Sequence, residues 1–169
     1  MTEQTTPPTP PAYAGFWLRF VAFILDALIL GAAKWIILAP LLALFGISTI
    51  AAGLEHPSAS PESMLSFSKL LALITVAAIY SAIILCVLYW LYYALMESSS
   101  KQATVGKMAL GLKVTGLNGE RISFGKASGR FFAKYISGLI LFIGYMMAGF
   151  TEKKQALHDI VSDCLVVKK

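Results

Sequence analysis

Residues 70–96 read LLALITVAAIYSAIILCVLYWLYYALM, a stretch without one charged side chain. An α-helix rises about 1.5 Å per residue, so this run is long enough to cross a hydrocarbon core about 30 Å thick. Its aromatic residues gather toward the end, where amphipathic rings prefer the level of the lipid headgroups. The stretch therefore predicts a membrane-spanning helix, and the rest of the chain is interpreted around it.

A second long apolar run precedes this stretch. Residues 16–38 are interrupted by only three charged side chains, Arg19, Asp26 and Lys34. We expect the run to form another spanning helix that ends or kinks at Pro40, because proline has no amide hydrogen and disfavours helical geometry in the residue before it. The two runs predict two transmembrane helices.

The composition agrees with a membrane protein and argues against a soluble enzyme. Of the 169 residues, 57% are hydrophobic and only 14% are charged, far from the balance of soluble domains. The net charge is +5, but the basic residues flank apolar runs, so anionic membrane lipid rather than nucleic acid is the expected partner. No nucleophile and base pair, cofactor motif or metal-ligand spacing is found in the sequence, and we expect no enzymatic activity, cofactor or metal.

The ends of the chain differ in character. Residues 1–14 are rich in threonine and proline and predict a disordered N-terminal tail, whereas residues 15–169 form the expected membrane domain.

Residues 112–115 alternate in polarity, Asn118-Gly119 is a strong turn signal, and residues 121–124 follow it. We predict a small cytoplasmic β-hairpin there, to which residues 165–167 add a third strand.

A third apolar segment, residues 131–150, is interrupted by glycines and has two possible paths. It either crosses the membrane or dips into it and returns. Lysines and arginines lie on both sides of the segment, and the positive-inside rule places such flanks in the cytoplasm. This favours a re-entrant segment, with the N-terminus and the polar C-terminal part both cytoplasmic. The predicted fold is thus all-α in the membrane, with two spans and a third re-entrant or spanning segment.

Asp26 is the most informative charged residue, because a carboxylate deep in a membrane helix needs a partner, a cavity or a proton. Tyr89 on the second helix is the expected partner from matching depths in the bilayer. Arg19 lies on the same face of the first helix, but about 10 Å away along the axis, so we do not expect a direct pair. Asp26 either takes part in transport or joins helices together.

Basic and small residues share the segment that begins the third apolar region. Lys126, Arg130 and Lys134 recur every four residues and are expected to face anionic lipid on the inner leaflet, from an amphipathic helix. A ridge of small residues lies beside them and allows close approach of another helix. The ridge consists of Gly125, Gly129, Ala133 and Ser137.

Three sequence motifs in this order resemble the RDD family of small bacterial multi-pass membrane proteins. They are residues 15–20 with Asp26, residues 104–107 with 111–114, and residues 155–159. The resemblance extends from residue 14 to 167. The chain departs from the family pattern at Gly116, where an acidic residue is common, and at residues 162–164, which replace an Ala-Gly-Thr sequence.

The resemblance implies the roles of particular residues and a location. Arg19 and Asp26 would be the first two signature residues, and Asp159 the third, with His158 as a further candidate beside it. The location implied is the bacterial plasma membrane. The family is suspected of transport, and we expect a small transporter of a cation or other small solute, proton-coupled through Asp26 and working as a homo-oligomer. The alternative is a non-transporting scaffold or accessory subunit that assembles through its helices and basic end.

Overall fold

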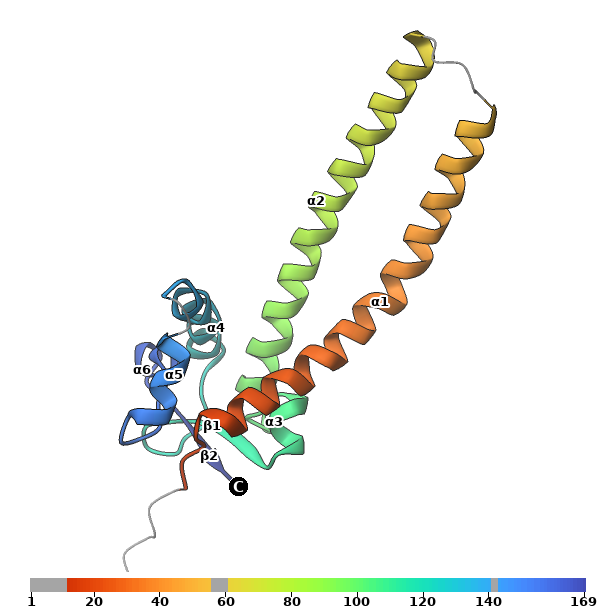
Figure 1. The fold of residues 1–169 in the computed structure, drawn as a ribbon. Helices are drawn as coiled ribbons and strands as arrows, with labels where there is room; N and C mark the ends of the chain where they lie inside the picture. The colour runs from red at the N-terminus through yellow and green to blue at the C-terminus, as the bar shows by residue number, and fades with distance from the viewer. Residues whose placement is uncertain (1–11, 56–60, 141–142) are drawn as a thin grey trace, which may run out of the picture. The chain divides into compact units, whose positions relative to one another are not determined.

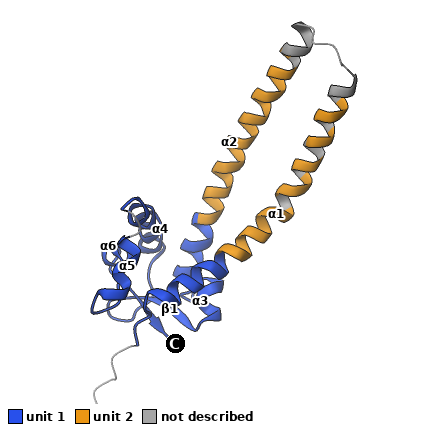
Figure 2. Ribbon diagram, in the orientation of Figure 1, with its two compact units in different colours: residues 1–26, 90–169 blue, residues 27–89 orange. Residues whose placement is uncertain are grey.

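The computed structural model describes residues 12–55, 61–140 and 143–169. These described residues form six helices and two strands (Figure 1). They divide into two compact units, which are considered separately below (Figure 2). Unit 1 consists of the chain up to residue 26 together with residues 90–169, and unit 2 consists of residues 27–89.

Unit 2 contains the greater part of two long helices, α1 (Phe16–Glu55) and α2 (Pro61–Ser98). Their large apolar side chains are mostly exposed; Ile36, for example, is 75% and Leu73 66% exposed. The stretches Phe16–Pro40 and Phe67–Ser98 are long and apolar enough to cross a membrane. This confirms the two predicted apolar helices, whose uncovered sides require lipid or another protein around them.

We expected the first helix to end or kink at Pro40. It does not end there, because α1 continues through this residue to Glu55. Proline removes one hydrogen bond of the helical ladder, at a cost of about 3 kcal/mol in a water-exposed helix. Apolar helices tolerate this loss more readily, because their other backbone groups have no alternative partner in lipid.

The third apolar segment is broken rather than continuous. Helix α4 (Phe124–Leu139) and helix α5 (Ile143–Phe150) are bent by 103° at the break between them. The bend fits either a broken span or a re-entrant path. A side-chain carbon on Gly144 would lie 2.8 Å from Cβ of Ser137, so α4 and α5 touch where both residues are small. Ser137 of the predicted ridge thus contacts a helix of the same chain.

The sheet has two strands, β1 (Leu112–Gly116) and β2 (Cys164–Lys168). They are antiparallel, with Leu112 opposite Lys168. The predicted pairing with the C-terminal segment is confirmed, but the hairpin strand at residues 121–124 is wrong. The chain turns at residues 117–119, where the amide of Gly116 donates to the Glu120 carbonyl at 2.8 Å. Residues 121–123 form no strand, and Ser123 caps the N-terminus of α4 by accepting a hydrogen bond from the amide of Lys126.

Tyr13 and Ala14, which the sequence assigned to the N-terminal tail, are part of the described fold. Tyr13 forms a bridge with Val167, and the amide of the fully buried Ala14 donates to the Val166 carbonyl at 2.8 Å. Residues 1–11 of the predicted tail lie outside the described residues.

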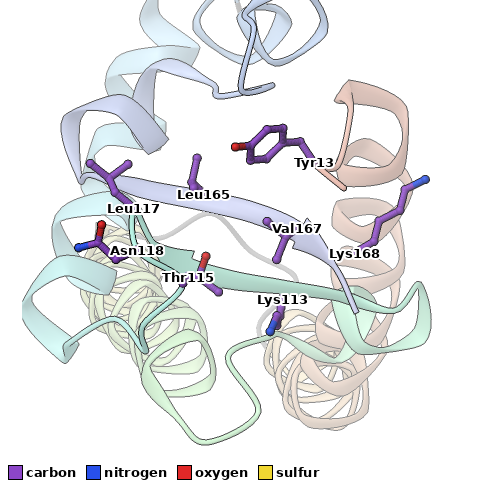
Figure 3. A pocket seen from close by; sticks show the side chains of 9 residues that line it. Tyr13, Lys113, Thr115, Leu117, Asn118, Leu165, Val167 and Lys168 are labelled. Carbon is purple, nitrogen blue, oxygen red and sulfur yellow. The ribbon is translucent and has the colours of Figure 1, made fainter. Parts of the chain in front are cut away.

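Tyr13, Thr115 and Leu165 line a pocket of about 380 Å³ on the sheet (Figure 3).

Candidate functional site

Asp26 is buried in unit 1, with only 1% of its surface exposed. Its carboxylate accepts hydrogen bonds from the Tyr92 hydroxyl at 2.9 Å, the Thr104 hydroxyl at 2.6 Å and the Gly106 amide at 2.7 Å. Gly106 belongs to the short helix α3 (Val105–Ala109). These donors satisfy an ionised carboxylate, which can only accept hydrogen bonds. Asp26 thereby joins α1, α2 and α3.

Tyr92, and not the predicted Tyr89, is the tyrosine that binds Asp26. The two tyrosines are three residues apart, almost one helical turn. The prediction compared the depths of Asp26 and Tyr89 in the bilayer, counted along two antiparallel helices. Such a count does not fix the shift of one helix along the other to better than about one turn. Tyr92 also accepts a hydrogen bond from the amide of Val105 at 3.1 Å, which helps to hold the start of α3.

Asp159 is fully buried in the short helix α6 (Leu157–Val161) and forms ion pairs with two arginines. Arg19 of α1 binds one carboxylate oxygen, which also accepts from the Ala156 amide at 3.1 Å. Arg130 of α4 binds the other oxygen through Nε at 2.8 Å and Nη2 at 2.6 Å. Burial alone would raise the pKa of Asp159, but Arg130 and Arg19 hold it well below its usual range.

Glu97, near the end of α2, extends this arrangement. Its carboxylate lies 2.7 Å from Nη1 of Arg130, 2.5 Å from Nζ of Lys107 and 3.6 Å from Nζ of Lys134. We call the connected set the buried ion cluster. It contains Arg19, Glu97, Lys107, Arg130, Lys134 and Asp159. Four formally positive groups thus share two carboxylates, and the cluster links five helices: α1, α2, α3, α4 and α6.

Lys107 is a cation of the cluster whose pKa is strongly lowered by burial. Its side chain is 9% exposed, and burial lowers its pKa to about 7, with Glu97 opposing this shift and Arg130 and Lys134 adding to it. Neither Lys107 nor Glu97 was among the predicted site residues. A signal was present, because Glu97 is the first charge after the uncharged run 70–96, and a carboxylate at that place invites a cationic partner.

The prediction that Lys126, Arg130 and Lys134 all face lipid is wrong for two of them. The side chain of Arg130 is 2% exposed and that of Lys134 is 20% exposed, and both lie beside Glu97. The helical spacing does put them on one side of α4, but that side packs against α6, which carries Asp159. Lys126 is exposed.

His158 is buried next to the cluster but is not one of its cations. Its Nδ1 lies 3.5 Å from the Ser137 hydroxyl and its Nε2 3.5 Å from Asp159. Burial lowers the pKa of His158 to about 3, so the ring is neutral at physiological pH.

Of the predicted site residues, Arg19 and Asp159 meet directly, with His158 beside them, whereas Asp26 belongs to a separate set of hydrogen bonds.

Comparison with known proteins identifies the family of the chain. The model of the RDD family matches residues 13–163. The chain is 39% identical to the uncharacterized protein YxaI of Bacillus subtilis, over 92% of this chain and 97% of the relative. It is 33% identical to the uncharacterized membrane protein YteJ of the same organism, over 92% of this chain and 81% of the relative. No solved structure gives a significant match. The chain is a membrane protein that belongs to the RDD family.

Proposed function

We propose that this protein is a subunit of a proton-responsive transporter for a small ion or other small solute in the bacterial plasma membrane. The observation that carries the proposal is the buried ion cluster, in which an ammonium group with a pKa of about 7 shares Glu97 with two other cations. Groups with strongly perturbed pKa values in a shared site are candidates for proton-linked function.

Loss of the Lys107 proton changes the balance of charge in the cluster. The formal sum falls from two excess positive charges to one, and Glu97 then depends on Arg130 and Lys134. Lys107 belongs to α3, Glu97 to α2 and Arg130 to α4, so the proton alters the attraction among three helices. A change of this kind is a physical means of linking pH to the arrangement of helices.

In this proposal Asp26 positions the responsive group, Lys107. Its carboxylate has donors on both oxygens and binds the amide of Gly106, the residue directly before Lys107. It therefore fixes the start of α3 and with it the place from which Lys107 reaches Glu97.

The proposal includes assembly of several copies, because two long helices cannot enclose a pathway by themselves. The exposed apolar sides of α1 and α2 support this, since they require lipid or neighbouring subunits. The basic residues on both sides of residues 131–150 favour a cytoplasmic location for the N-terminus and for the polar C-terminal part.

Flux through the protein reconstituted in vesicles should change with pH around a midpoint near 7. Lys107→Arg keeps its charge throughout and should hold flux at its acidic value, whereas the uncharged Lys107→Met should hold it at its alkaline value. A pH-sensitive dye and a panel of Na⁺, K⁺ and small anions provide the measurement. Lys101→Met, at an exposed lysine nearby, is the control and should keep the wild-type pH profile. Unchanged profiles in both well-assembled Lys107 variants would reject the proposal.

A scaffold role is the second candidate, and the complete hydrogen bonding of Asp26 favours it. In the same assay Asp26→Asn separates the alternatives. An Asp26 proton carrier requires that this variant assemble but lose pH-dependent flux, while a positioning role for Asp26 predicts a weakened, still pH-dependent flux. A scaffold predicts no flux from the wild-type protein with any solute, together with altered assembly of the variant.

A further inference from the structure

An apolar groove of about 450 Å³ lies in unit 1, between the first turn of α1 and helix α5. Phe16, Trp17, Met146 and Phe150 supply most of its surface. Two of these side chains are unusually exposed for large aromatics, Trp17 at 73% and Phe150 at 84%. Exposed apolar surface of this kind, beside a candidate membrane span that begins at Phe16, marks contact with another molecule.

Lys154 is the one charged residue among the described residues that line this groove. Its backbone is fixed, because Arg19 of the buried ion cluster donates through Nη2 to the Lys154 carbonyl at 2.6 Å. Its aliphatic stem passes Gly15, where an added side-chain carbon would lie 3.7 Å from Cδ of Lys154. Within the described part of the chain its ammonium forms no ion pair. A positive charge is thus held beside apolar surface without an acidic partner.

We infer that this groove binds one anionic phospholipid, with an acyl chain along the aromatic lining and the phosphodiester at Lys154. The charge favours this occupant, since a zwitterionic lipid brings a cationic headgroup together with its phosphate, and a second copy of the chain would need to bring a carboxylate to the Lys154 ammonium. Tryptophan near the level of the headgroups suits the same arrangement. The inference involves neither Lys107 nor transport and therefore goes beyond the proposed function.

Native mass spectrometry of the purified full-length protein, titrated with phosphatidylglycerol or phosphatidylcholine, tests the inference. The wild-type protein should bind one phosphatidylglycerol molecule with preference over phosphatidylcholine. Lys154→Asn should weaken the phosphatidylglycerol affinity about fivefold, the contribution of roughly one basic residue, and weaken the phosphatidylcholine affinity less, because the choline cation offsets the phosphate charge. Asparagine is chosen because Lys154 has a φ of 50°, a left-handed conformation that asparagine tolerates.

Lys153→Asn is the matched control, because Lys153 is the exposed neighbour and does not line the groove. It should retain the wild-type preference, and all variants should unfold at the wild-type temperature. As a second measurement, phosphatidylglycerol with brominated acyl chains should quench wild-type fluorescence more than that of Trp17→Phe. Equal affinity for both lipids, equal losses in Lys153→Asn and Lys154→Asn, or a dimer that only Lys154→Asn disrupts would each overturn the inference.

Discussion

Arg130→Met should destabilise the protein more than any other single change in the buried ion cluster, by about 3 to 5 kcal/mol. Arg130 is the residue that connects the two carboxylates, with Nη1 at 2.7 Å from Glu97 and Nη2 at 2.6 Å from Asp159. Its removal leaves Glu97 with two lysines and Asp159 with Arg19, but it takes away the guanidinium donor from Oε2 of Glu97 and Oδ1 of Asp159, two buried carboxylate oxygens. Thermal unfolding of the full-length protein in detergent should therefore shift to a clearly lower temperature.

Lys126→Met is the matched control for this variant. Lys126 lies one turn before Arg130 on α4 and is exposed, so its charge is not needed for compensation. Its replacement should change stability by less than about 0.5 kcal/mol. Equal unfolding temperatures of the Arg130 and Lys126 variants would show that the cluster contributes no net stability and would remove the physical basis for a linked set of helices.

Gly106→Ala should have the second largest effect, a loss of about 2 to 3 kcal/mol. An added methyl group would overlap the carbonyl oxygen of Ala22 and lie 3.0 Å from Cγ of Asp26. Helix α3 would have to move away from α1, which weakens the hydrogen bonds of Gly106 and Thr104 to Asp26. The same unfolding measurement, together with the pH dependence of flux, would detect the displacement of Lys107 that follows.

Gly129→Ala in α4 is the control, because a methyl group there meets no atom within 4 Å. Alanine inside a helix should raise stability by about 0.5 to 1 kcal/mol relative to glycine. A Gly106→Ala variant as stable as the wild type would mean that α3 and α1 do not approach as closely as their hydrogen bonds indicate.

The three signature residues have two different physical roles. Arg19 and Asp159 form an ion pair that joins α1 to α6, and Arg19 also binds the carbonyls of Ala14 and Lys154. Asp26 instead holds α3 through backbone and hydroxyl donors. In both cases a charged side chain forms hydrogen bonds or ion pairs with groups that are distant in sequence. These contacts join segments of the polar part of the chain, and in our proposal the proton-responsive Lys107 depends on them.

The sequence by itself determined the features that depend on local composition and length. The uncharged run 70–96 and the run from Phe16 specified long apolar helices, since their length and hydropathy are properties of the segments alone. The Asn118-Gly119 turn also followed from local chemistry, with Gly119 at a φ of 82°. The C-terminal strand was predicted for the same reason.

Only the tertiary structure decided which charges are buried and with which partners. Helical spacing placed Arg130 and Lys134 on one side of α4, but could not show that Glu97 and Asp159 lie against that side. The choice of Tyr92 over Tyr89 depended on a relative shift of about one helical turn, which no local pattern encodes. Burial of a charge is favourable only where a partner from a distant segment compensates it, so such a site exists only once those segments are packed together.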